Sequence, residues 1–211
     1  MTEFDRLARA ISACRLCEDR FAQTPTGHAP RPVLWAAPGA PILIASQAPG
    51  TKVHASGRPF DDQSGARLRD WIGVDEDTFW NRSLISFQPM AFCFPGQDAK
   101  GGDLPPPPIC AATWAAPLSA ALGPARLTLL VGGAAQRHHL PRALWAKGQS
   151  ATVRNWQDLP AGVIALPHPS WRNTHWLKNN PWFADELLPI VKARVRAALA
   201  DAPLAQPGGG D

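Results

Sequence analysis

The fold is decided by residues 42–65, which read ILIASQAPGTKVHASGRPFDDQSG. Residues 42–46 are all apolar or small and follow Pro41, and a run of this kind is typical of a buried parallel strand. Pro49 and Gly50 then end the strand in a sharp turn. In open α/β sheets, ligands bind at the carboxyl ends of the strands. The turn and the polar loop after it are therefore the first candidates for a functional site.

The same order of strand, turn and helix recurs along the chain. Apolar runs predict further strands at residues 83–87, 127–131 and 163–166. Helical periodicity and end signals predict helices at residues 3–13, 64–72, 110–122 and 181–199. Buried strands that alternate with helices form a parallel sheet covered on both faces. We therefore predict a three-layer α/β/α sandwich with a central, mainly parallel sheet of about four strands.

The length of the chain predicts a single domain. It has 211 residues, which is usual for one domain and sufficient to bury a substantial core. We expect residues 1–200 to form this domain. Residues 201–211 are rich in proline and glycine, and we expect a disordered tail there.

Composition limits the class of protein. The sequence has no run of about 18 apolar residues, and its amino terminus lacks the basic-then-apolar order of a secretory signal. We therefore expect a cytoplasmic protein that does not enter the membrane. We also expect a monomer. The formal net charge is +4 and the sequence pI is about 9.2. This mildly basic balance is compatible with a polyanionic partner.

The four cysteines form a candidate metal site. They fall into two pairs, Cys14 with Cys17 and Cys93 with Cys110. Cysteines of cytosolic proteins are more often metal ligands or reactive thiols than disulfides. A Cys-x2-Cys spacing lets both thiolates reach one metal, and four thiolates suit tetrahedral zinc or a [4Fe-4S] cluster. The residues alone leave three alternatives: the cluster, a structural zinc ion, or buried free thiols without metal.

Four short motifs resemble those of a known enzyme family. They are APG at residues 48–50, GRPF at residues 57–60, SGARL at residues 64–68 and HPS at residues 168–170. In this order, at the ends of the first and fourth predicted strands, they resemble the first and second motifs of the uracil-DNA glycosylase superfamily. The cysteines are similar in order and approximate spacing to those of its family 4 enzymes, a resemblance that implies a [4Fe-4S] cluster.

The resemblance implies hydrolysis of the bond between uracil, or a related deaminated base, and deoxyribose in DNA, which starts base-excision repair. Such an enzyme extrudes the nucleotide, because the glycosidic bond is unreachable inside a duplex. By the family pattern, Phe60 stacks on the face of the base. His168 donates a hydrogen bond to the uracil O2, where negative charge builds as the bond breaks. The backbone groups that meet the base belong to Gln47, Ala48, Pro49 and Gly50.

The first motif departs from the family at Gln47, where family 4 enzymes carry an acidic residue. Glutamine cannot act as a general base, so another group has to orient the water that attacks C1′ of the deoxyribose. The loop after the turn offers three candidates, His54, Asp61 and Asp62. Asp61 directly follows the stacking Phe60 and is expected near the edge of the base.

A second departure concerns recognition of the base and the DNA. The family's asparagine, which contacts the pyrimidine edge, falls here on Pro89, and Gln88 is the nearest amide that could replace it. In this superfamily the loop after the HPS motif enters the minor groove, where a wedge and a cation hold the gap left by a flipped base. The DNA-binding residues expected from this loop are Ser170, Trp171, Arg172 and Asn173.

The replacement of the acid by Gln47 leaves a second function open. A protein of the same fold, with weak or lost catalysis, could bind damaged, abasic or single-stranded DNA. A third alternative rests on the cysteines alone and is a redox-active cluster protein that does not act on DNA.

Overall fold

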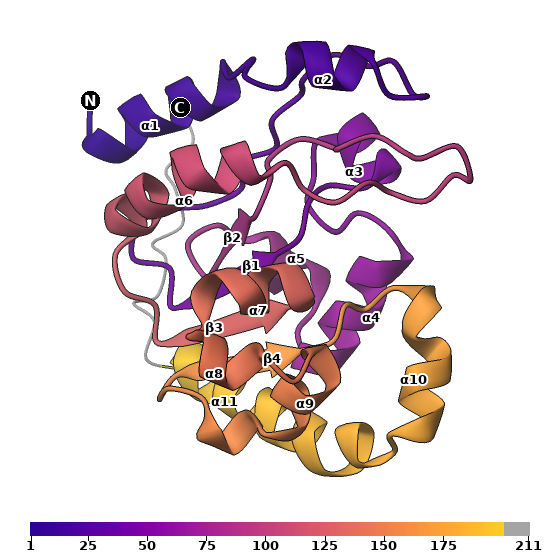
Figure 1. The fold of residues 1–211 in the computed structure, drawn as a ribbon. Coiled ribbons are helices and arrows are strands. Elements are labelled where there is room, and N and C mark those ends of the chain that lie inside the picture. Colours follow the sequence, from indigo (N-terminus) through magenta and orange to yellow (C-terminus); the bar gives the residue numbers. More distant parts are fainter. Residues whose placement is uncertain (201–211) are drawn as a thin grey trace.

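A central parallel sheet runs through the computed structural model, which describes residues 1–200 (Figure 1). Its strands are β1 (Ile42–Ser46), β2 (Ile85–Pro89), β3 (Leu127–Val131) and β4 (Val163–Leu166). They lie in the order β2-β1-β3-β4, and each neighbouring pair is parallel. The predicted α/β fold with a four-stranded parallel sheet is confirmed. The tail at residues 201–211 lies outside the described residues.

Helices cover both faces of the sheet. Alternate residues of each strand point to opposite sides, so each face presents side chains against which helices can pack. One face packs against α4 (Gln63–Ile72) and α11 (Leu188–Ala200). The other face packs against α1 (Glu3–Ser12), α6 (Pro108–Leu122) and α7 (Gly133–His139). Figure 1 shows α1 lying along α6, on the side of the sheet away from α11. The architecture therefore has three layers, as the sequence predicts.

The remaining helical segments are short and connect these layers. They are α2 (Glu18–Ala22), α3 (Thr51–Ser56), α5 (Glu76–Trp80), α8 (Arg142–Trp145), α9 (Gln149–Arg154), α10 (Thr174–Asn179), the 3-10 turns η1 (Trp156–Asp158) and η2 (Trp171–Asn173), and the π-helical turn η3 (Phe183–Leu187). The π-helical turn runs directly into α11, so the two together form the long last helix that the sequence predicts. Among residues 1–200, no helix is both long and apolar enough to cross a membrane.

Strand β2 lies two residues further along the chain than residues 83–87, where the sequence predicts it. Asn81 holds the residues before it in a turn. Its side chain accepts a hydrogen bond from the N–H of Ser83, and its carbonyl accepts one from the N–H of Leu84. The strand ends on Pro89, which is tolerated because β2 is an edge strand of the sheet.

The polar loop predicted after β1 contains the helix α3. This helix begins after the turn at Gly50 and ends at Gly57, whose φ of 75° is left-handed. Its short length and its β-branched residues Thr51 and Val53 give it little helical signal in the sequence. The helix matters for the site, because it determines where the side chain of His54 points.

Candidate active site

A pocket of about 400 Å³ opens at the carboxyl ends of β1, β2 and β4. This volume is in the range of pockets that enclose a small ligand. The turn after β1 forms one wall, the loop with the GRPF motif forms a second, and the segment after β4 forms a third. Most of the site residues predicted from the sequence line it: Gln47, Ala48, Pro49, Gly50, Phe60, Asp62, His168, Ser170, Trp171, Arg172 and Asn173.

The turn after β1 is held in place by backbone hydrogen bonds on two sides. The N–H of Met90 donates to the carbonyl of Ser46 at 2.9 Å, and the N–H of Ala91 donates to the carbonyl of Gln47 at 3.1 Å. On the other side, the carbonyl of Gly50 accepts from the N–H of His54 at 2.9 Å. The backbone of the turn is therefore anchored on both sides, as a preorganised binding surface needs.

Phe60 is positioned by an unusual backbone conformation. Its φ of 56° makes it the single non-glycine residue with positive φ among residues 1–200. Such conformations are rare for a bulky residue and concentrate at functional sites. The ring contacts Phe79 and Phe87, with centroids 6.2 and 5.8 Å away. One edge of the ring is thus supported by the core while the residue lines the pocket.

The loop that carries Phe60 is fastened to α5 by Trp80. The indole Nε1 of Trp80 donates to the carbonyl of Pro59 at 2.8 Å. The guanidinium of Arg58 lies 3.7 Å from the centre of the Trp80 ring and forms an ion pair with Asp61 at 3.0 Å. These contacts fix the GRPF motif against Trp80.

His168 is held as a neutral imidazole with one defined donor. Its Nδ1 accepts a hydrogen bond from the N–H of Ser170 at 3.2 Å, so in the neutral ring the proton is on Nε2. Burial lowers the pKa of His168, and the carboxylates of Asp62 and Asp103 oppose this shift. The amide of Asn173 donates to the carbonyl of His168 at 2.7 Å. The side chain therefore presents an N–H donor, not a full positive charge.

His168 packs against Gly132, which directly follows β3. A Cβ on Gly132 would lie 3.4 Å from the Cβ of His168 and 3.5 Å from its Cδ2. The φ of Gly132 is 84°, a left-handed conformation that favours glycine. These distances are ordinary contacts, so the backbone conformation, more than a lack of space, favours glycine beside His168.

The segment after His168 is tied to the first motif by Arg67. The guanidinium of Arg67 donates to the carbonyls of Pro169 at 3.3 Å and Ser170 at 3.1 Å. Beyond this tie, the side chain of Trp171 is 71% exposed. The Arg172 guanidinium lies 5.9 Å from the centre of the Trp171 ring. The segment thus places an exposed aromatic ring and a cation at the rim of the pocket.

Three of the predicted site residues lie outside the pocket lining. The ring of His54 packs against His28 and Phe94, because α3 turns it away from the base site. Asp61 is engaged by Arg58. Gln88 is fully buried, and its amide donates to α6 at the carbonyl of Ala115 and the hydroxyl of Ser119, both at 2.9 Å. Gln88 cannot replace the family's asparagine, because neighbouring residues of a strand face opposite sides.

Three further polar residues, which the sequence did not indicate as site residues, line the pocket: Ser46, Ser64 and Asp103. Asp103 belongs to a loop that begins after β2 and folds back over the turn that follows β1. The pair Gly101-Gly102 before it marks a turn in the sequence, but nothing there indicates where the loop returns. Asp103 and Asp62 are the two carboxylates that line the pocket.

The four cysteines line a second, separate cavity. Its other walls are apolar and include Ile11, Leu16, Phe92 and Trp114. All four thiols are free. Burial, with a smaller contribution from the neighbouring thiols, raises the pKa of Cys93 to about 12 and that of Cys110 to about 11. The chain thus gathers soft sulfur donors from three separate segments around one space.

The fit of this cavity to a metal centre can be judged from its donors. The Nε1 of Trp114 is buried and has no hydrogen-bond partner among the described residues. A cluster sulfur or a thiolate could accept a hydrogen bond from this N–H group. Within residues 1–200, however, no three Cys, His, Asp or Glu side chains are gathered closely enough to hold a metal ion as they stand. The four thiols are the donor type of a thiolate-bound centre, but among the described residues they do not form a closed ion site as they stand.

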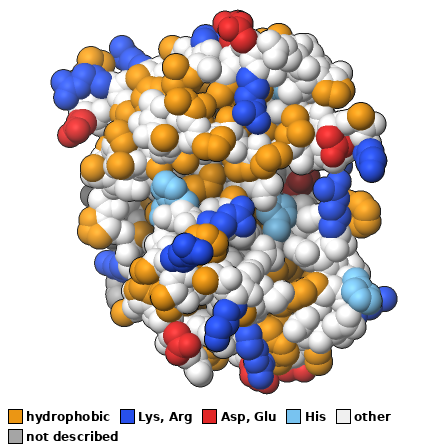
Figure 2. Space-filling model, in the orientation of Figure 1, with side chains coloured by type: hydrophobic (Ala, Val, Ile, Leu, Met, Phe, Trp, Pro, Cys, Tyr) orange, Lys and Arg blue, Asp and Glu red, His pale blue; other side chains and the backbone are white. Residues whose placement is uncertain are grey.

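Hydrophobic side chains are visible on the face that Figure 2 shows. Figure 2 shows hydrophobic side chains gathered in the upper half of the view, where α1 and α6 lie. Leu16 and Ile109, next to the cysteines, are 59% and 51% exposed. Lysine and arginine side chains are more scattered over the same face.

Comparison with known protein families gives one match. The model of the uracil DNA glycosylase superfamily matches residues 35–192. The matched range contains β1 to β4 and every residue of the pocket except Val33. It excludes Cys14 and Cys17 and includes Cys93 and Cys110.

Proposed function

Because the chain belongs to the uracil DNA glycosylase superfamily, we propose that it is a monofunctional DNA glycosylase that removes uracil or a related deaminated base and leaves an abasic site. The observation that carries the proposal is the arrangement of His168 in the pocket. Its Nδ1 is occupied by the N–H of Ser170, so its Nε2–H is available to the O2 of a bound pyrimidine. A fixed donor aimed at developing charge lowers the barrier by about 3 kcal/mol.

The other walls of the pocket support the same reaction. Phe60 offers an aromatic face, and stacking of a base on such a face contributes about 1–3 kcal/mol of binding. The turn at residues 47–50 lines the pocket with its backbone and with the side chains of Gln47, Ala48 and Pro49. Together they favour a planar base withdrawn from the stack, which is the geometry that base-excising enzymes need.

The proposal is tested by incubating the protein with oligonucleotides that contain a single uracil, in single-stranded and double-stranded form. Alkali then cleaves each abasic site, and we expect strand scission at the uracil. Because Pro89 lines the pocket where the family's asparagine would stand, the same assay should include hypoxanthine and xanthine. Intact strands with every deaminated base would contradict a glycosylase.

Gln47 favours one alternative, a protein of the same fold that binds damaged, abasic or single-stranded DNA with little or no catalysis. Its side chain lines the pocket where the family keeps an acid. The two functions differ in turnover. Base release no faster than that of a His168→Ala variant, together with tight binding to abasic DNA, would establish the binding protein.

Trp171 is proposed to act as a wedge in duplex DNA. We expect Trp171→Ala to slow base release from a duplex about 10-fold, because an inserted side chain offsets part of the unstacking cost of about a few kcal/mol. Release from a single strand should change little, since no base pair has to be opened. The melting temperature should also be unchanged, because the side chain is 71% exposed. Equal slowing on both substrates would show a different role.

We propose that Cys14, Cys17, Cys93 and Cys110 hold a [4Fe-4S] cluster that joins the amino-terminal helices to the loop after β2. Protein purified without air should be brown and contain iron and acid-labile sulfide in equal amounts. Cys93→Ser should lose both and melt at a lower temperature, because metal binding contributes to folding. A colourless protein with stoichiometric zinc would replace this proposal by the zinc alternative.

A measurement of the reduction potential in a Trp114 variant tests the cluster proposal a second time. Hydrogen bonds to cluster sulfurs raise the reduction potential, so Trp114→Phe should retain the iron and lower the midpoint potential. Trp145→Phe is the matched control, because Trp145 does not line the cysteine cavity. An unchanged potential in Trp114→Phe would show that the indole N–H does not reach the cluster.

A further inference from the structure

The pocket lacks an acid at Gln47 but contains two other carboxylates, those of Asp62 and Asp103. Hydrolysis of a glycosidic bond needs a group that orients water toward C1′ and accepts its proton. Asp62 already has a structural role. It caps the amino terminus of α4, where its Oδ1 accepts from the N–H of Gly65 at 2.9 Å. Asp103 caps none of the described helices, and its side chain accepts a hydrogen bond from Gln97 of its own loop.

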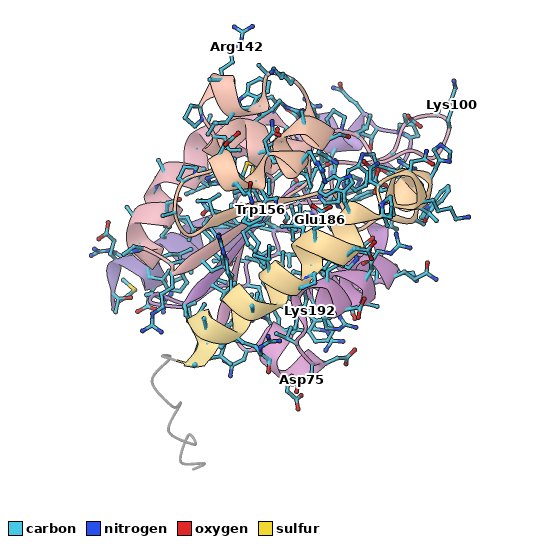
Figure 3. All side chains as sticks on the ribbon, turned by 90° about the horizontal axis from the view of Figure 1, so that it is seen from below. Asp75, Lys100, Arg142, Trp156, Glu186 and Lys192 are labelled. Carbon is cyan, nitrogen blue, oxygen red and sulfur yellow. The ribbon has the colours of Figure 1, made fainter. Side chains whose placement is uncertain are left out.

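The loop that carries Asp103 is a hydrogen-bonded hairpin. Gln97 and Asp103 pair as an antiparallel bridge, and the N–H of Leu104 donates to the carbonyl of Gly96 at 2.9 Å. The side chain of Asp98 closes the tip by accepting from the N–H groups of Lys100 and Gly102. Figure 3 shows Lys100 at the outer end of this loop, pointing away from the protein. Asp103 is therefore held at the inner end of a braced hairpin, not on a free loop.

The two oxygens of Asp103 have different surroundings. Its Oδ1 accepts a hydrogen bond from Nε2 of Gln97 at 3.2 Å. Its Oδ2 lies 3.6 Å from the position that a Cβ on Gly50 would occupy. One oxygen is thus fixed by the hairpin, and the other lies against the same turn that carries Gln47. The carboxylates of Asp62 and, to a smaller extent, Asp103 both oppose the effect of burial on the pKa of His168, so both face the same pocket as the imidazole.

We propose that Asp103 is the catalytic carboxylate that replaces the acid missing at position 47. This inference rests on the proposed glycosylase function. As the bond between C1′ and the base breaks, its electron pair leaves with the base as an anion, which His168 stabilises. The oxygen of a water molecule forms the new bond to C1′, and the Oδ2 of Asp103 accepts the proton that this water loses and later releases it to solvent.

The test compares three isosteric variants on uracil-containing DNA in single-turnover reactions. Asp103→Asn keeps the shape and removes the proton acceptor, and we expect base release to slow about 10²-fold or more. Asp62→Asn also removes a charge from the pocket but retains the helix cap, because asparagine caps as well as aspartate. Asp77→Asn makes the same change on the exposed surface of α5 and should release the base at the wild-type rate.

Binding separates a chemical role from a structural one. Affinity is measured with a duplex containing 2′-fluoro-deoxyuridine, whose glycosidic bond resists cleavage. Asp103→Asn should bind this DNA as tightly as the wild type or more tightly, since removal of a negative charge favours contact with phosphates. Weakened binding with an unchanged rate for bound DNA would overturn the proposal.

The outcomes distinguish this inference from the function on which it rests. An active wild type with an equally active Asp103→Asn overturns the role of Asp103 and leaves the glycosylase intact. A large loss in Asp62→Asn alone assigns the water to Asp62 and also overturns it. A wild type that releases no deaminated base removes both proposals together.

Discussion

Replacement of His168 by alanine is expected to slow single-turnover base release about 10²–10³-fold, the usual effect of removing one preorganised donor. The imidazole is fixed at Nδ1 by the N–H of Ser170, so its Nε2–H can meet the O2 of the leaving base without rearrangement. The fold should survive, because Asn173 donates to the backbone carbonyl of His168, which the substitution retains. DNA affinity should therefore fall far less than the rate.

The pH dependence follows from the direction of the pKa shift. Burial lowers the pKa of His168 below its ordinary value of 6.5. At neutral pH the ring is neutral, and the rate should fall when acid protonates Nδ1 and removes its hydrogen bond from Ser170. Between the lowered pKa and 6.5 the unfolded chain binds more protons than the folded protein, so this group makes stability rise with pH. The His168→Ala variant should lose this acid limb of the rate profile.

His175→Ala is the control for His168. His175 is exposed on α10, where its Nε2 contacts the amide of Asn179, and it does not line the pocket. Its loss should leave both the rate and the pH profile unchanged. A His168→Ala enzyme that retains the wild-type rate on uracil would refute the assignment of the donor.

Replacement of Gly65 by alanine is expected to damage the site and the fold together. A Cβ on Gly65 would lie 1.7 Å from the carbonyl oxygen of Phe60 and 2.7 Å from its carbonyl carbon. The obstacle is backbone, so no side-chain rotation relieves it, and the Phe60 loop has to move. Such overpacking costs about 1–3 kcal/mol, and a displacement of about 1 Å at a reacting centre costs about 10²-fold in rate.

Two measurements test the Gly65 prediction: the melting temperature and the rate of base release. Ala66→Gly is the matched control, because residue 66 is exposed in the same helix. This control loses about 1 kcal/mol of helix propensity without moving Phe60, so it should melt earlier but retain its rate. If Gly65→Ala keeps the wild-type rate, stacking on Phe60 does not depend on the close approach of α4.

The sheet was predictable from the sequence because its strands are buried on both faces. Continuous apolar runs such as residues 42–46 and 127–131 have no polar period, and glycine or proline ends each of them, so their type and order follow from local signals. The exact extent of β2 was not predictable in the same way. Its start depends on the turn at Asn81 and its end on the tolerance of an edge strand for Pro89.

The parts of the site that were predictable are those that lie next to strand ends. The turn at residues 47–50 and His168 directly follow β1 and β4, so the topology alone places them together. Asp103 was not predictable, because only the return of its hairpin brings it to Gly50, 53 residues earlier in the chain. The role suggested for His54 depended on a loop, and the structure has a helix there.

Gly132 shows that a position can matter for the site through the atoms it lacks. It offers no group to DNA or to the base, yet any larger residue would have to adopt a left-handed backbone while its Cβ lay in contact with His168. In a mutational scan scored by repair, this position should be as intolerant of change as the histidine itself. In a scan scored by DNA binding, substitutions of Gly132 should have no effect. Intolerance to substitution at this position would therefore mark a residue that supports a reactive group, not the reactive group itself.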